Sequence, residues 1–293
     1  MCRVTVGAVA GPLLVVDTPY MLFRAFYALP KSIVDSRGRP VNALLGAANA
    51  ILREVEDRDP RAVVLCFGPD AAEYRLELFP AYHADREGIP DGLDFQYEDS
   101  VEFFEAFGWT AAVHDSLEAD DLLNAFAQHE VAAGGTALLL TGDRDMFQCA
   151  SEKVRVLYAG RGGVEEMGPA EVEGRYGIPP ELVPDFIALR GDPSDGIPGA
   201  KGVGEKTAAE LLRKHGSLEG VLDAAIRERR VSLRTALTGS REQLLAFKEV
   251  ATLRNEKVRR PRDKRTDFAS AAKAARKRGM NRLARRLEEA AAQ

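Results

Sequence analysis

The sequence predicts an α/β fold, a doubly wound and mostly parallel sheet flanked by helices, followed by a smaller all-helical region. Three short apolar runs, at 13–17, 62–67 and 137–143, each lead into a polar or glycine-bearing turn, as buried parallel strands do. Helical sequences lie between these runs, and the alternation of strand and helix favours a doubly wound sheet. Ligands of such sheets gather beyond the carboxyl ends of the strands, where Asp17 and Asp143 fall.

The first run, LLVVD, ends at Asp17, and the helical composition of 43–55 predicts the helix that precedes the second strand. The segment 117–132 predicts another helix, with Ser116 available as its N-cap. Its expected inner face consists of apolar side chains at helical spacing: Leu122, Leu123, Phe126 and Val131.

The character of the chain changes after residue 167, because prolines punctuate short helical segments and no strand pattern follows. We therefore expect three parts: an α/β domain over 1–167, a helical domain over 168–260, and a basic terminal helix or tail over 261–293. No internal repeat or low-complexity tract interrupts them.

Composition limits the class of protein. The chain has 293 residues, of which 45% are hydrophobic, which is enough to bury a core. Three cysteines, Cys2, Cys66 and Cys149, are widely spaced and form neither a disulfide framework nor a zinc motif. We expect a monomer in a reducing cytoplasm, with no membrane span.

The charge is unevenly distributed. Segment 227–286 contains 20 Lys and Arg against 6 Asp and Glu, a balance of +14, so the rest of the chain carries −19 of the total of −5. A basic region can bind phosphates directly, whereas an acidic region binds a polyanion only when cations neutralise it. Ordinary solvated helix faces are the alternative explanation of 227–286.

Acidic residues gather in several short motifs. EADD at 118–121, TGDRD at 141–145 and GDPSD at 191–195 join Asp17 to give carboxylates from four chain segments. Mg²⁺ and Mn²⁺ prefer such oxygen ligands, and two ions can assist hydrolysis of a phosphodiester. Taken singly, EADD is also typical of an acidic first turn of a helix, and TGDRD of a turn after a strand.

The third motif continues into a glycine turn, GVGEKTAAELLRKHG, that opens a helix. Gly202 and Gly204 allow a tight turn before the free N–H groups of the helix, and Lys206 and Thr207 add donors for a phosphate. The pattern is not a Walker A loop, because Glu205 rather than lysine follows the second glycine. An ordinary helical hairpin is the alternative.

These motifs together resemble the 5′ nuclease family: bacterial 5′-3′ exonucleases, the N-terminal nuclease domain of DNA polymerase I, and flap endonucleases. The matching stretches cover about 13–222 in family order: VVDTPYMLFRAFYALP, EYRLELFPAYHADR, EADD, TGDRD and GDPSDGIPGAKGVGEKTA. The resemblance implies a PIN-like nuclease domain with a helical gateway near 70–110. It also implies a helix-three-turn-helix DNA-binding domain, with K⁺ at its turn.

The resemblance also implies roles for individual residues. Two or more Mg²⁺ or Mn²⁺ ions would be bound by eight carboxylates: Asp17, Glu118, Asp120, Asp121, Asp143, Asp145, Asp192 and Asp195. Three gateway residues would act at the scissile phosphate: Arg75, His83 and Arg86. Further residues would contact DNA: Arg24, Tyr82, Lys201, Gly202, Gly204, Lys206 and Thr207. The interleaved rings and cations of 74–86 also suit single-stranded nucleic acid, although buried packing would explain Phe79 and Tyr74.

Two positions depart from the family pattern. Gly68 stands where an acid is usual, with Asp70 as a displaced substitute, and His83 replaces a lysine. Histidine is mostly neutral at pH 7 and is therefore the weaker electrophile. The sequence thus predicts a DNA hydrolase acting at 5′ ends, 5′ flaps and nicked or gapped duplex in replication or repair. The alternatives are a DNA-junction-binding protein with weakened catalysis and an RNA-directed nuclease.

Overall fold

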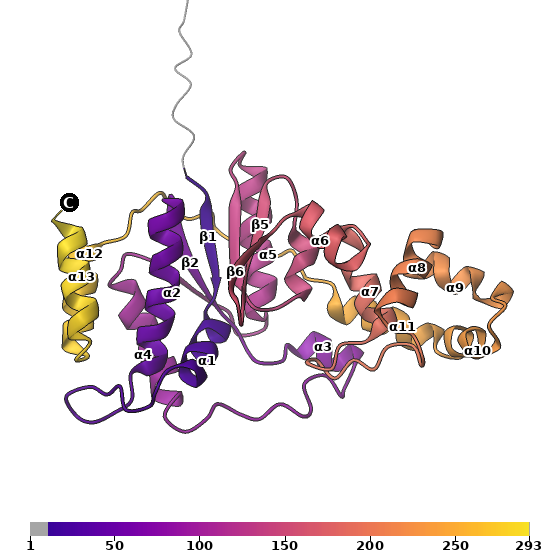
Figure 1. Cartoon of the computed structure of the whole chain (residues 1–293), viewed down its shortest axis with the longest axis horizontal. Coiled ribbons are helices and arrows are strands. Elements are labelled where there is room, and N and C mark those ends of the chain that lie inside the picture. The colour runs from indigo at the N-terminus through magenta and orange to yellow at the C-terminus, as the bar shows by residue number, and fades with distance from the viewer. Residues whose placement is uncertain (1–10, 293) are drawn as a thin grey trace, which may run out of the picture.

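A six-stranded sheet forms the centre of the molecule (Figure 1), in a computed structural model that describes residues 11–292. The strand order is β3-β2-β1-β4-β5-β6, with β6 antiparallel to β5 and all other neighbours parallel. The strands are β1 (Leu13–Asp17), β2 (Ala62–Phe67), β3 (Thr110–Val113), β4 (Ala137–Thr141), β5 (Val154–Gly160) and β6 (Gly163–Met167). The predicted sheet is confirmed, and Cys2 lies outside the described residues.

The three strands that the sequence predicts occupy the middle of the sheet, where every residue of β1, β2 and β4 is buried. β3 and β6 lie at the two margins of the sheet, and in β5 Arg155 interrupts the apolar run. β3 is exposed or half-buried along its length, and β6 carries two exposed glutamates, Glu165 and Glu166. Strands at the margin of a sheet bury fewer side chains, which is why periodicity alone did not reveal them.

Helices cover both faces of the sheet. One face carries α1 (Thr18–Ala28), α2 (Asn42–Arg58), α4 (Asp94–Glu105), α12 (Phe268–Lys277) and α13 (Asn281–Ala291), which share one hydrophobic cluster with Leu14 and Val16. The other face carries α5 (Ala119–Ala132), η1 (Asp145–Cys149) and α7 (Val183–Arg190), packed on Leu13 and Val15. The alternation of Leu13, Leu14, Val15 and Val16 thus distributes β1 between the two faces.

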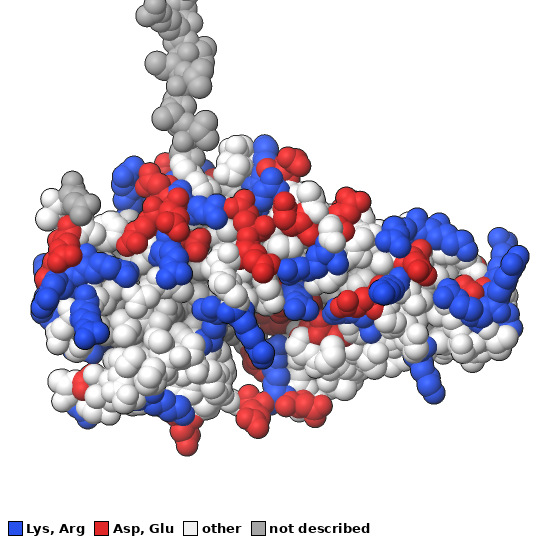
Figure 2. Space-filling model, in the orientation of Figure 1, with Lys and Arg blue, Asp and Glu red and all other residues white. Residues whose placement is uncertain are grey.

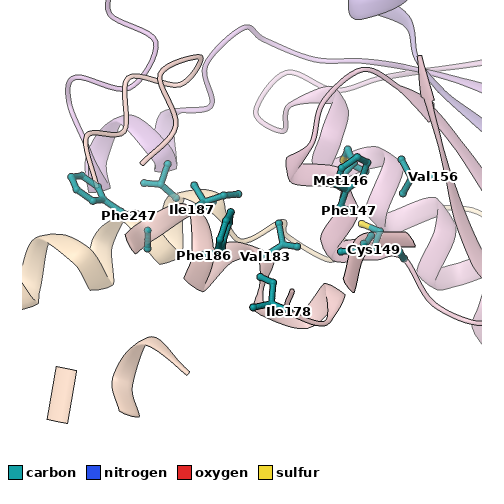
Figure 3. Packing of buried hydrophobic residues seen from close by; sticks show 14 of the residues in the cluster. Met146, Phe147, Cys149, Val156, Ile178, Val183, Phe186, Ile187 and Phe247 are labelled. Atoms are coloured by element: carbon teal, nitrogen blue, oxygen red, sulfur yellow. The ribbon is translucent and has the colours of Figure 1, made fainter. Parts of the chain in front are cut away.

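The helical region continues the second of these clusters. Its elements are α6 (Pro169–Tyr176), η2 (Pro180–Leu182), α8 (Glu205–His215), α9 (Leu218–Ala224), η3 (Ala225–Arg227), α10 (Val231–Gly239) and α11 (Arg241–Ala251). Figure 3 shows Phe147 and Cys149 of η1 beside Val183 and Phe186 of α7, with Phe247 of α11 beyond them. Because sheet and helical region share one core, their relative position is fixed by packing.

Three segments take definite forms in the structure. Of the basic helix or tail expected over 261–293, residues 268–291 form the α12–α13 hairpin, which packs on α4. The N-cap position of helix α5 is Glu118 rather than Ser116, and the Glu118 side chain makes no capping hydrogen bond. The expected helical gateway near 70–110 consists of α3 (Glu73–Leu78), an irregular segment and α4.

Within this segment helix α4 is part of the hydrophobic core, because Phe103 and Phe104 are fully buried. No helix within the described residues is long and apolar enough to span a membrane.

Candidate active site

Acidic side chains from separate elements gather at the carboxyl edge of the parallel strands. Asp17 ends β1, Asp120 lies in the first turn of α5, and Asp143 follows β4. Asp145 begins η1, and Asp192 and Asp195 lie in the loop between α7 and the glycine turn. We call these six residues the carboxylate cluster: Asp17, Asp120, Asp143, Asp145, Asp192 and Asp195. Figure 2 shows acidic side chains recessed between the sheet and the helical half of the molecule.

Burial and mutual repulsion make the charged forms of these carboxylates costly. Burial raises the pKa of Asp143 to about 7, with repulsion from Asp195 as the next cause. Burial followed by repulsion from Asp143 raises the pKa of Asp120 and of Asp145 well above the ordinary value. Burial also raises the pKa of Asp17. Such a cluster is stable as an anion only if cations enter it.

The donor set fits a divalent cation. Within residues 11–292, Oδ1 of Asp120 is a buried side-chain oxygen without a hydrogen-bond partner, and oxygen ligands are those preferred by Mg²⁺ and Mn²⁺. In the same described range, no three His, Cys, Asp or Glu side chains already converge as a ready metal-binding group. The structure therefore brings the acids to one edge without closing them around a single point.

Local backbone features position the cluster. Asp17 caps α1 by accepting from the Tyr20 backbone N–H at 3.0 Å, and its other oxygen accepts from the Thr141 hydroxyl at 2.8 Å. Gly142 lies against the Tyr20 ring, so that any side chain there would displace the ring. The backbone pairing of Asp192 with Ile197 closes the GDPSDGI loop. These contacts explain why TGDRD and GDPSD carry glycine beside the acids.

Two acids of the EADD motif face a different set of partners. Asp121 is fully buried and accepts from Arg75 at 3.1 and 3.0 Å, from the Tyr74 hydroxyl and from the Arg254 backbone N–H. Glu118 accepts from the Ala72 backbone N–H at 2.7 Å and pairs with Arg75 at 3.0 Å. Asp121 is thus fully engaged within the protein, and Glu118 is only at the margin of the cluster.

Arg75 and Tyr82 are not placed as the sequence predicted. Arg75 is 3% exposed and, besides its acid partners, donates to the Val250 carbonyl, so its guanidinium is not available to a phosphate. Tyr82 is 5% exposed and donates its hydroxyl to Glu118 at 3.0 Å, so its ring is not available for stacking on a base. Both are corrections. The physical reason is that buried Asp121 and Glu118 need a buried cation, which the sequence did not reveal.

His83 and Arg86 lie beside the cluster. His83 Nδ1 donates to the Asp70 carbonyl at 2.6 Å, and its Nε2 lies 3.1 Å from Oδ1 of Asp195. The His83 ring stacks on Tyr82 with centroids 3.8 Å apart, and its φ of 54° is left-handed. Arg86 is exposed and bridges Asp70 at 3.0 Å and Asp195 at 3.5 Å. Both side chains therefore face Asp195, one of the two cluster acids that come from the helical half.

Packing around position 68 leaves no room for the carboxylate that Gly68 lacks. A Cβ at this position would collide with the Leu117 carbonyl oxygen and would lie 2.8 Å from Cα of Glu118. The loop before α5 therefore occupies the space that an acid at 68 would need. Asp70 does not replace it, since its exposed side chain pairs with Arg86.

The residues predicted to contact DNA outside the gateway remain accessible. Lys201, Gly202, Gly204 and Lys206 are exposed, and Thr207 is half-buried. The glycine turn allows close approach, because Cβ atoms at Gly202 and Gly204 would meet nothing within 4 Å. Arg24 is half-buried and donates to the Gly160 carbonyl at 3.2 Å, at the same edge as the cluster.

A doubly wound sheet with a carboxylate cluster at its edge, continued by a helical region with an open glycine turn, defines the class of metal-dependent nucleases. The family model described as "5'-3' exonuclease, N-terminal resolvase-like domain" matches residues 12–177. A second model, "5'-3' exonuclease, C-terminal SAM fold", matches residues 178–271. The chain belongs to the 5′-3′ exonuclease family.

Individual relatives agree with this assignment. The chain is 38% identical over 258 residues to a 5′-3′ exonuclease of Mycobacterium tuberculosis, covering 80% of this chain and 79% of the relative. It is 39% identical over 215 residues to DNA polymerase I of Mycobacterium bovis, covering 72% of this chain but 24% of the polymerase. The chain therefore spans about a quarter of that polymerase's length.

Solved structures share the fold. The bacteriophage T5 D15 flap endonuclease, in a complex with DNA and metal ions, has a TM-score of 0.71 at 17% identity, covering 96% of this chain and 100% of that one. T5 5′-exonuclease with bound zinc gives a TM-score of 0.69 at 17% identity, covering 96% and 99%.

Proposed function

We propose that this chain hydrolyses DNA phosphodiester bonds as a 5′-3′ exonuclease and a 5′-flap endonuclease. The observation that carries the proposal is Asp120, whose buried Oδ1 has no hydrogen-bond partner within residues 11–292 and is therefore suited to bind a cation. Family membership supports the substrate class, since the M. tuberculosis relative is a 5′-3′ exonuclease. Nicked and gapped duplexes with a 5′ end belong to the same substrate class.

Mg²⁺ or Mn²⁺ is the proposed metal, and the carboxylate cluster would hold it. Asp17, Asp120, Asp143 and Asp145 project from the sheet edge, and Asp192 and Asp195 approach from the helical half. A bound divalent ion supplies charge neutralisation and Lewis acidity for phosphodiester hydrolysis. Because Asp121 is engaged by Arg75 and Tyr74, we assign it to positioning of α5 rather than to the metal.

The remaining residues bind and orient the DNA. Arg86 lies at the cluster with its side chain 39% exposed and can donate to a phosphate oxygen at the site. His83 holds Asp195 in place through Nε2. The glycine turn, with Lys201 and Lys206 exposed beside it, would bind the duplex backbone, and K⁺ is its proposed monovalent ion.

The test is cleavage of a labelled 5′-flap duplex in Mg²⁺, in Mn²⁺ and in chelator. We expect metal-dependent cleavage by the wild type and its loss in Asp120→Ala. The matched control is Asp115→Ala, an exposed acid five residues earlier, which should cleave normally. Cleavage by Asp120→Ala at the wild-type rate would contradict the assignment.

A DNA-junction-binding protein with weakened catalysis is the second candidate. This second function is favoured by the contacts of His83, whose two ring nitrogens face the Asp70 carbonyl and Oδ1 of Asp195. Position 83 therefore offers no free positive charge of the kind that a lysine would supply. Tight binding of the flap duplex without cleavage in either metal would support it. An RNA flap on the same duplex tests an RNA-directed nuclease in the same assay.

A further inference from the structure

A groove of about 710 Å³ is lined by Arg144, the neighbour of Asp143 in the carboxylate cluster, and by Glu205, which follows the glycine turn. One wall is the turn between β5 and β6, at 160–163. Because β5 runs parallel to β4, this turn lies at the same edge as Asp143. The opposite wall includes Glu205, the first residue of α8, directly after Gly204 of the glycine turn. A DNA strand that reaches from the turn to the cluster would therefore pass this groove.

The acidic side chains that line the groove are already neutralised. Glu165 pairs with Arg175 at 2.7 Å, and Glu205 pairs with Arg190 at 3.1 Å. Two further lining arginines, Arg144 and Arg161, are exposed and make no ion pair within residues 11–292. The groove consequently carries a surplus of positive charge on these two guanidinium groups.

The two arginines differ in their contacts with the rest of the protein. Arg144, which stands between the two acids of TGDRD, donates to the Tyr158 hydroxyl at 3.3 Å. Arg161 occupies the tip of the β5–β6 turn between two glycines. A planar guanidinium binds two phosphate oxygens at once, which suits it to a nucleic-acid backbone. The half-buried rings of Tyr158 and Tyr176 complete the wall and add apolar surface for a sugar or base.

We propose that this groove is a phosphate-binding site for the DNA strand between the glycine turn and the carboxylate cluster, with Arg144 and Arg161 as its ligands. The proposal rests on the proposed function, because it presumes a DNA substrate at that cluster. It adds a site outside the predicted residues, formed by the β5–β6 turn that the sequence pattern did not reveal. Arg161 gives the cleanest test of this site. Within residues 11–292 its exposed side chain makes no hydrogen bond or ion pair that would stabilise the fold.

The test is the affinity of intact enzyme for a fluorescent 5′-flap duplex, measured by anisotropy in chelator over a series of KCl concentrations. Each lost phosphate contact should reduce the slope of log affinity against log salt by about 0.7–0.9, which is about a 5- to 8-fold loss of affinity at 0.1 M salt. We expect this for Arg161→Ala, and about twice the change in slope for Arg144→Ala/Arg161→Ala. Arg161→Lys should retain most of the slope because it keeps the charge.

The matched control is Arg276→Ala, which removes an exposed arginine of the α12–α13 hairpin that is paired with Glu288. It should bind as the wild type does. Equal slopes for Arg161→Ala, the double variant and this control would overturn the groove proposal while leaving the proposed function intact. Failure of the wild type itself to cleave the flap duplex in Mg²⁺ and in Mn²⁺ would instead overturn the proposed function.

Discussion

Replacing Arg75 with methionine should destabilise the fold rather than simply weaken DNA binding. Arg75 is 3% exposed and joins three elements: it pairs with Asp121 and Glu118 of the EADD motif and donates to the Val250 carbonyl of α11. Methionine keeps most of the apolar stem, so the change isolates the guanidinium. It leaves Asp121, which is fully buried, with only the Tyr74 hydroxyl and one backbone N–H as donors.

The size of the destabilisation by Arg75→Met follows from the burial of both Arg75 and Asp121. Removing one member of a buried ion pair leaves an uncompensated charge and costs about 3–5 kcal/mol in free energy of unfolding. The comparison is Arg86→Met, which loses an exposed pair with Asp70 at 3.0 Å and a longer contact with Asp195 at 3.5 Å, from a side chain that is itself 39% exposed. Exposed pairs contribute at most about 1 kcal/mol, so Arg86→Met should unfold close to the wild type.

Equilibrium unfolding in urea, followed by circular dichroism, measures both variants. DNA affinity is measured on the same samples in buffer without denaturant. If Arg75→Met unfolds within about 1 kcal/mol of the wild type and yet binds the flap duplex more weakly, then Arg75 is a phosphate ligand. That result would refute the structural role that we derive from the buried network.

Further predictions concern pH, packing and the hairpin. Burial alone would raise the pKa of Glu130, but hydrogen bonds from Arg61 and Arg260 outweigh it and lower the pKa. The stabilisation by ionised Glu130 is present above its unfolded-state pKa and is lost as pH falls through the lower folded-state pKa. The melting temperature of the wild type should therefore fall more steeply between pH 6 and pH 2 than that of Glu130→Gln. Gly68→Asp should lower the melting temperature without increasing cleavage, because the loop before α5 fills the space; increased cleavage would contradict this. Deleting 268–292 should yield aggregated protein, because the hairpin covers part of the hydrophobic core, and a soluble monomer of unchanged stability would disprove it.

The sequence was sufficient to predict the central strands of the fold and the sheet edge at which Asp17 and Asp143 lie. Strands β1, β2 and β4 are continuous apolar runs because both of their faces are covered, and such runs are visible without a structure. The carboxyl ends of parallel strands share one edge, so Asp17 and Asp143 could be placed together in advance. Lys201 and Lys206 beside the glycine turn are exposed, and their contact with DNA stays a prediction from the sequence.

Only the tertiary structure decided which side chains are free to act. Arg75 and Arg86 lie eleven positions apart in one cation-rich segment, and the sequence alone does not distinguish them. Arg75 is buried because α3 packs on α11 and the Arg75 guanidinium supplies the counter-charge of Asp121 and Glu118, whereas Arg86 remains at the surface. The same holds for Gly68, whose missing carboxylate is explained by a backbone segment fifty residues away. The local sequence shows the periodicity of an element and the sheet edge to which a residue belongs. The exposure of a side chain depends on partners that folding brings together from distant parts of the chain.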